Sequence, residues 1–160
     1  MNIEAIEKAD LSKYRELILP YIYDELSDSA GELDENYICL AGCIENEDGI
    51  LIPVSALVML METNGDLALL SIYTLPERRC QGIASELLEK AIFIGRQLYI
   101  FDEGENEEFI NLKAIYRLSE KFRTPFEEFL KKNNFTDFYL LDEQDDPQVW
   151  AAIEEIRFYR

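Results

Sequence analysis

The chain has 160 residues, of which 48% are hydrophobic and 12% aromatic, so we expect one folded domain over residues 1–160 with a sizeable core. Its formal net charge of −18 argues against binding to nucleic acids or anionic membrane surfaces. The charge favours cationic partners, although solubility alone accounts for it equally well. The absence of histidine excludes Ser-His-Asp and Cys-His mechanisms.

The first part of the chain predicts a short strand, two helices and a loop. Ile3–Ile6 fits the strand, and Asp10 is a suitable N-cap for the first helix. The apolar face of that helix is formed by Leu11, Tyr14, Leu17 and Ile18. Pro20 interrupts this pattern or opens a second helix over Tyr21–Leu26. The polar stretch Ser27–Asn36 predicts the loop.

Three apolar segments then predict an antiparallel meander. The segments are Tyr37–Glu45, Ile50–Thr63 and Leu67–Leu75. The turn Asn46–Gly49 separates the first two, and Pro53 predicts a bulge or an edge in the second. Asn64-Gly65 between the second and third is the strongest hairpin signal in the chain.

The most informative stretch is Leu67–Leu98, which predicts a strand, a polar turn and a helix over Gln81–Leu98. The turn carries the pattern Arg79-x-x-Gly82-x-Ala84. Such a helix start presents free backbone N–H groups and the positive end of the helix dipole, and small residues let a pyrophosphate approach closely. Two alternatives stay open: an ordinary strand-to-helix turn, and arginines that only offset the surrounding acidic charge.

The last part of the chain predicts an acidic loop, a strand, a helix and two further strands. The loop is Phe101–Glu108, and the strand Phe109–Tyr116 is expected to lie parallel to Leu67–Leu75. Thr124 is the expected N-cap of the helix, with Pro125 at its first position and Asn134 as its C-terminal cap. Tyr139–Leu141 and Val149–Tyr159 complete the chain, the latter as one strand or as a helix followed by a strand.

The cysteines and the first residues of the chain indicate the cellular compartment of the protein. Cys39, Cys43 and Cys80 form an odd set, so we expect reduced thiols, with the first two on one side of a core. A metal site is not expected, because there is no fourth sulfur and no histidine. The start of the chain lacks a signal-peptide pattern and no apolar run is long enough to span a membrane, so we expect a cytoplasmic protein without a membrane.

The stretch from Leu67 to Leu98 resembles the acetyl-CoA-binding core of the GCN5-related N-acetyltransferase (GNAT) family, whose signature is Gln/Arg-x-x-Gly-x-Gly/Ala. The resemblance implies the acyl-CoA N-acyltransferase fold, an α/β (α+β) arrangement with a mixed, mostly antiparallel central sheet of six to seven strands flanked by helices. It implies transfer of an acetyl group from acetyl-CoA to a primary amine of a small molecule or basic side chain. The element order fits the family along nearly the whole chain, and Phe129–Phe135 resembles its fourth helix in part.

The resemblance also implies the residues that contact acetyl-CoA. In the family a bulged strand holds pantetheine and the thioester oxygen through backbone N–H groups, which corresponds here to Ser71–Leu75, and the turn binds the pyrophosphate. The predicted acetyl-CoA-binding residues are Ile72, Tyr73, Thr74, Leu75, Arg78, Arg79, Cys80, Gln81, Gly82, Ile83, Ala84 and Ser85.

The chain departs from the family at its catalytic positions. Leu130 stands where many members have a tyrosine that protonates the leaving thiolate, and Leu67–Leu75 has no acid to serve as base. The remaining candidates are Glu62, Tyr73 and Tyr139, each of which is otherwise structural, and catalysis by proximity alone stays open. Cys80 is expected to lie beside the phosphates and not the thioester.

Two other functions therefore remain alternatives. One is a catalytically weak GNAT-like module that binds coenzyme A, and the other is an acidic protein-interaction module. The expected acceptor is cationic, and the loop of residues 100–108 either selects it or is merely solvated. Formation of a homodimer through the last strand stays open.

Overall fold

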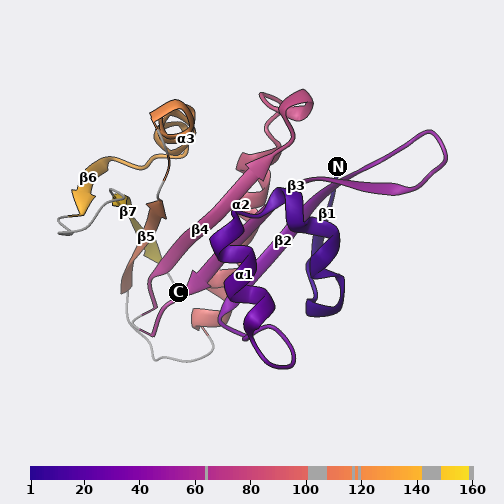
Figure 1. The fold of residues 1–160 in the computed structure, drawn as a ribbon. Coiled ribbons are helices and arrows are strands. Elements are labelled where there is room, and N and C mark those ends of the chain that lie inside the picture. The colour runs from indigo at the N-terminus through magenta and orange to yellow at the C-terminus, as the bar shows by residue number, and fades with distance from the viewer. Residues whose placement is uncertain (64, 101–107, 117, 119, 142–148, 159–160) are drawn as a thin grey trace.

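The described strands form one mixed sheet (Figure 1). The structure is a computed structural model, and it describes residues 1–63, 65–100, 108–116, 118, 120–141 and 149–158. In sheet order the strands are β1 (Asn2–Ala5), β2 (Tyr37–Glu45), β3 (Leu51–Met61), β4 (Leu67–Thr74), β5 (Glu108–Tyr116), β7 (Val149–Phe158) and β6 (Asp137–Leu141). Only β4 and β5 pair in parallel, which confirms the predicted mixed, mostly antiparallel sheet.

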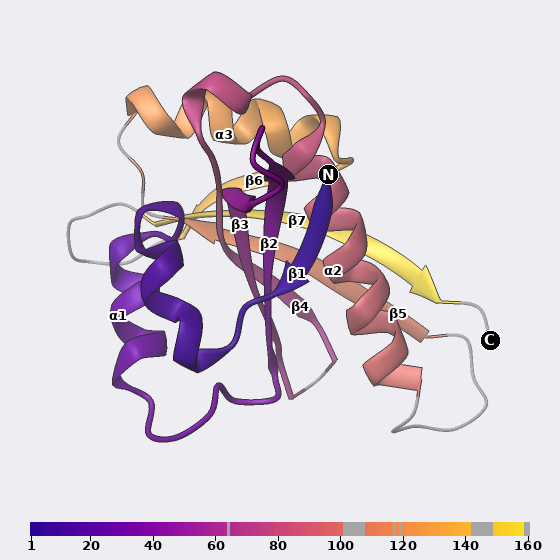
Figure 2. The ribbon, with the colours of Figure 1, turned by 90° about the vertical axis from the view of Figure 1, so that its right-hand side faces the viewer.

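Helices cover both faces of the sheet. They are η1 (Lys8–Leu17), α1 (Pro20–Asp28), η2 (Pro76–Arg78), α2 (Ile83–Ile100) and α3 (Glu120–Lys132). Figure 2 shows α1 and α2 on opposite sides of the strands. Neighbouring residues of β3 enter different cores because strand side chains alternate: Leu57 packs with α2 and α3, and Val58 packs with η1 and α1. None of the described helices is long and apolar enough to cross a membrane.

The first helix differs from its prediction. It begins at Lys8 as a 3-10 helix, so Asp10 lies inside it. The carboxylate of Asp10 forms an ion pair with Lys13 at 2.6 Å and does not cap a backbone N–H group. The buried residues Leu11, Tyr14 and Leu17 are three apart, and a 3-10 helix with three residues per turn places all of them on one face. The predicted apolar face is confirmed, whereas Asp10 as N-cap is wrong. Pro20 opens α1 as predicted.

The helix α3 begins one turn before its predicted start, so Pro125 lies inside it and Thr124 is not the N-cap. Proline there removes one hydrogen bond near the start of the helix, and the ion pair between Arg123 and Glu127 (3.8 Å) spans the same turn. The predicted C-terminal cap is confirmed. Asn134 has a φ of 71°, and the N–H of the following Phe135 donates to the carbonyl of Leu130 at 3.1 Å.

The strands follow their predictions closely. β2 has the predicted bounds, and a register shift opposite Gly42 and Cys43 leaves Val54 as an extra residue beside Pro53, which confirms the bulge. β3 pairs on both sides, so it is not an edge strand. β7 is one strand without a preceding helix among the described residues. It pairs with β5 on one side, and β6 covers only Val149–Ile153 on the other, so no described strand pairs with the outer side of Glu154–Phe158. Of the predicted loop Phe101–Glu108, residues 101–107 lie outside the described residues, and Glu108 begins β5.

The three thiols are predicted to differ sharply in reactivity. Cys39 and Cys43 are buried in the core under η1 and α1, and burial raises the pKa of Cys39 to about 12, whereas Cys80 is exposed. We expect Ellman's reagent at pH 8 to modify Cys80 about a hundredfold faster than the other two. The Cys80→Ser variant should lose the fast phase. Equal rates for all three thiols in the native protein would contradict this placement.

Candidate active site

A bulge in β4 is the first element of the site. Val58 pairs with Ser71 and Met59 with Leu69, so Leu70 is an extra residue without a partner on β3. Leu70 packs against the core under α1, and the adjacent Ser71 turns to the same side, where its Oγ accepts the N–H of Leu19 at 3.0 Å. Two consecutive side chains on one face are the signature of a bulge, which bends and twists the strand.

β4 separates from β5 immediately before this bulge. The parallel pairing joins only Leu67–Leu69 to Leu112–Ala114. Farther along, β4 pairs with β3, and Leu75 N–H donates to the carbonyl of Val54 at 2.9 Å. Because N–H groups alternate in direction along an antiparallel strand, those of Ile72 and Thr74 point away from β3 into the divergence. The extra residue lies one position before the predicted segment Ser71–Leu75, and within that segment the N–H of Leu75 is bonded to β3.

The turn after β4 forms the second element. Gly82 has a φ of 79°, which favours glycine, and no atom lies within 4 Å of where a Cβ would be. Its carbonyl accepts the N–H of Glu86 at 3.0 Å, so the helix α2 begins here and the N–H groups of Ile83, Ala84 and Ser85 have no acceptor within the helix. Cys80 also has a positive φ of 60°. An open glycine before a helix N-terminus fits a pyrophosphate group.

Arg79 ties this turn to the end of β4. Its Nε donates to the carbonyl of Thr74 at 3.0 Å, and its guanidinium carbon lies 5.2 Å from the centre of the Tyr73 ring. The hydroxyl of Thr74 is fixed in turn, 2.8 Å from Ser55 Oγ. Arg79 is therefore a structural contact of the strand end as well as a positive charge at the helix start, and Arg78 lies half-buried in η2 beside it.

The end of α3 approaches the start of α2. Asn133 Nδ2 donates to Ser85 Oγ at 3.3 Å and to the carbonyl of Phe129 at 2.9 Å. Leu130 is completely buried, so the position of the family's tyrosine belongs to the core. The contact of Asn133 was not predicted, because only the fold brings residues 85 and 133 together.

Tyr116 was also missed. It ends β5 beyond the last residue paired with β4, it is 1% exposed, and its hydroxyl donates to Glu127 Oε1 at 2.8 Å. Burial, with the hydrogen bond to Glu127, raises the pKa of the Tyr116 hydroxyl, so it stays protonated and holds α3 against the end of β5. No local sequence pattern indicates that a tyrosine at the end of a strand makes such a hydrogen bond to a helix.

The predicted catalytic residues do not gather at the divergence. Glu62 follows β3 at the opposite end of β4, where its Oε2 lies 3.1 Å from Lys113 Nζ. Lys113 also pairs with Asp66 at 2.9 Å, so these residues join the β3–β4 hairpin to β5. Tyr73 lies on the separated part of β4, half-buried against the core under α1. Tyr139 lies on β6, and its side chain is outside the described part of the structure.

The sequence and the fold match known proteins. The model of the acetyltransferase (GNAT) family matches residues 3–115. No curated protein matches the sequence. Among solved structures, a protein of Bacillus anthracis assigned as a streptothricin acetyltransferase, in complex with acetyl coenzyme A, superposes with a TM-score of 0.63 at 14% identity, covering 98% of this chain and 99% of that one.

Two further solved structures have the same fold. The ribosomal-protein-S18-alanine N-acetyltransferase of Escherichia coli has a TM-score of 0.59 at 16% identity, covering 98% of this chain and 92% of that one. An aminoglycoside 6'-N-acetyltransferase of Acinetobacter haemolyticus has a TM-score of 0.59 at 18% identity, covering 92% and 99%. Because these identities are low, the similarity to the three structures shows the fold alone.

Replacing Tyr116 with phenylalanine should lower the free energy of unfolding by about 1–1.5 kcal/mol, because a buried hydrogen bond to Glu127 is lost. Urea denaturation measures the change. Tyr14→Phe is the control, since Tyr14 is also buried but its hydroxyl makes no hydrogen bond to a described residue, and it should change stability by less than about 0.5 kcal/mol. Equal losses in both variants would contradict a specific role for the Tyr116–Glu127 contact.

Proposed function

The chain belongs to the GNAT acetyltransferase family, and we propose that it is an acetyl-CoA-dependent N-acetyltransferase for a primary amine of a small molecule or basic side chain. One observation carries the proposal. The bulge at Leu70 separates β4 from β5 and leaves backbone donors on β4 that lead directly to the open glycine turn at Gly82. The donors on β4 suit the acetyl thioester, and those at the turn suit the pyrophosphate.

In this proposal the N–H groups at the start of α2 bind the pyrophosphate, with Arg78 and Arg79 adding positive charge. The N–H groups of Ile72 and Thr74 bind pantetheine and the thioester oxygen. The residues proposed to contact acetyl-CoA are therefore Ile72–Leu75 and Arg78–Ser85, as the sequence predicts. Backbone donors carry most of this binding, so it depends on the shape of β4 and its turn more than on particular side chains.

The reaction is a direct transfer. The neutral amine attacks the thioester carbonyl carbon, the C–N bond forms, the C–S bond breaks, and the amine loses a proton. The β4 N–H groups would stabilise the developing oxyanion, and holding both reactants in place supplies much of the acceleration. Because Glu62 lies at the other end of β4, we propose that water removes the proton from the amine and that Tyr73, on the separated part of β4, protonates the departing thiolate.

The charge of the protein suits a cationic acceptor. A net charge of −18 creates a potential that attracts amines and basic peptides and that weakens with added salt. The free thiols of Cys39, Cys43 and Cys80 fit a reducing compartment, and we propose a cytoplasmic location.

A second candidate function is a module that binds coenzyme A or a partner protein without turnover. The buried Leu130 favours it, because this side chain replaces the family's proton donor and no described group takes that position on α3. Binding and turnover must therefore be measured separately.

Isothermal titration with acetyl-CoA tests the binding site. We expect micromolar affinity for the native chain and no detectable binding to Gly82→Glu, which places bulk and negative charge at the pyrophosphate position. The matched control is Gly31→Glu: Gly31 has a φ of 75° and open space around it, but it lies in the loop after α1. This variant should bind as the native chain does, while both variants lose about 1 kcal/mol of stability from the positive φ. Absence of binding to the native chain would overturn the proposal.

Acetyl transfer is tested with spermidine as a polycationic acceptor and ethanolamine as a singly charged one. Product formation is followed by mass spectrometry. We expect a KM for spermidine that rises about tenfold between low and high ionic strength, and a weaker salt effect for ethanolamine. Tight binding of acetyl-CoA without transfer to any amine would instead support the module without turnover.

A further inference from the structure

The outer edge at the start of β2 is only partly covered. β1 pairs with β2 only at Leu40–Cys43, and the N–H of Ile6 donates to the carbonyl of Cys39 at 2.9 Å before the chain turns into η1. Residues Tyr37–Cys39 pair with β3 on one side. On the other side the Tyr37 N–H donates to the carbonyl of Asp34 at 3.0 Å, and no described strand continues β1 past Ile6. This edge lies at the opposite end of the sheet from Gly82, because Tyr37 faces Leu60 at the end of β3.

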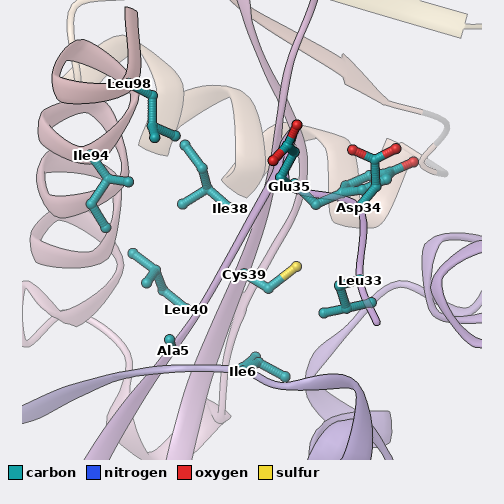
Figure 3. A pocket seen from close by; sticks show the side chains of 11 residues that line it. Ala5, Ile6, Leu33, Asp34, Glu35, Ile38, Cys39, Leu40, Ile94 and Leu98 are labelled. Carbon is teal, nitrogen blue, oxygen red and sulfur yellow. The ribbon is translucent and has the colours of Figure 1, made fainter. Parts of the chain in front are cut away.

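A cavity of about 250 Å³ lies along this edge (Figure 3). Figure 3 shows Ile94 and Leu98 of α2 on one side of it and the segment Leu33–Glu35 on the other. Its inner surface is apolar: Ile38 and Leu40 are 4% exposed, while Leu98 at the end of α2 is 39% exposed. The volume is below the roughly 300–1,000 Å³ of pockets for drug-sized ligands, so it suits one or two side chains.

The charge around the cavity is negative. The carboxylates of Asp34 and Glu35 lie at its rim, and none of the residues that line it is a Lys or Arg. Asp34 accepts the N–H of Asn36 with Oδ1 at 2.9 Å, and Glu35 forms no ion pair with a described residue. The stretch of residues 16–77, which supplies most of the lining, contains thirteen acidic residues and no basic one.

The backbone of the edge offers a donor and an acceptor. The carbonyl of Cys39 faces this side, since it accepts the N–H of Ile6. The N–H of Cys39 and the carbonyl of Tyr37 face the same side, because both backbone groups of alternate residues point in one direction in an antiparallel strand. A small apolar ligand would leave these groups without partners, whereas an extended peptide would hydrogen bond to them.

We propose that this edge of β2 binds an extended segment of a partner protein, with one apolar side chain in the cavity and a Lys or Arg beside Asp34 and Glu35. The carbonyl of Tyr37 and the N–H of Cys39 bond to the backbone of the segment, the cavity selects the apolar residue, and the carboxylates select the positive charge. The site lies apart from the proposed acetyl-CoA site, so its test needs no acetyl transfer.

The probe is a fluorescein-labelled heptapeptide with a central leucine flanked by lysines, and its binding is followed by fluorescence anisotropy. Leu98→Arg places a cation at the mouth of the cavity and should weaken binding about tenfold. Its control is Phe93→Arg, because Phe93 is 54% exposed on the same helix and does not line the cavity. Glu35→Lys should weaken binding about fivefold, and Glu47→Lys, outside the cavity, should not.

Amide NMR spectra of the native chain locate the peptide. We expect the largest shift changes at Tyr37–Leu40, and thermal unfolding shows that each variant is folded. Three results would overturn the proposal: no binding at roughly 1 mM peptide, equal weakening by the two arginine variants, or equal binding of free leucinamide, which would indicate a small-molecule pocket.

Discussion

The proposed site depends on a single constraint, the extra residue Leu70 in β4. Before it β4 is bonded to both neighbours, and after it β4 is bonded to β3 alone, so the N–H groups on the other edge become available to a ligand. Hydrogen bonds outside the strand ladder help to hold the separated segment in place, among them Leu19 N–H to Ser71 Oγ near its beginning and Arg79 to the carbonyl of Thr74 at its end. A site made of backbone in this way tolerates great variation in sequence, because it depends on the course of the strand and not on particular side chains.

An anionic ligand on a protein with a net charge of −18 requires favourable interactions at short range. Salt screens charges that lie more than about 8–10 Å apart, whereas the donors of a helix N-terminus act on a phosphate at hydrogen-bond distance. The charges are also separated along the chain: no basic residue occurs between Arg15 and Arg78, where the motif turn begins. The molecule thus combines a local positive site with a broadly negative surface.

Local patterns predicted the parts of the fold that local interactions determine. The bounds of β2, the hairpin at Gly65 and the cap at Asn134 follow from alternation and turn chemistry, and the structure has all of them. The errors arose where distant contacts decide. Glu62 is close in sequence to the motif strand, but antiparallel pairing places it beside Asp66, at the end away from Thr74. The partners of Tyr116 and Asn133 come from other elements, so no spacing rule could identify them.

Leu130 is buried at the position where many family members have a tyrosine that protonates the thiolate, and this affects whether a tyrosine could act there. A tyrosine at this position would bring a hydroxyl into a core made by Leu87, Leu112 and other apolar side chains, where it would need a partner to offset its loss of hydration. Restoring the family residue would therefore not restore the acid by itself. Leu130 instead packs α3 against the sheet, and Tyr116 and Asn133 hold that helix beside the divergence. In the proposed reaction the proton for the thiolate would then come from water or from the separated part of β4, where the described hydroxyls are Ser71, Tyr73 and Thr74. The hydroxyls of Ser71 and Thr74 already form hydrogen bonds, to Leu19 N–H and to Ser55 Oγ respectively. Replacing Tyr73 would therefore distinguish protonation by a side chain from protonation by water.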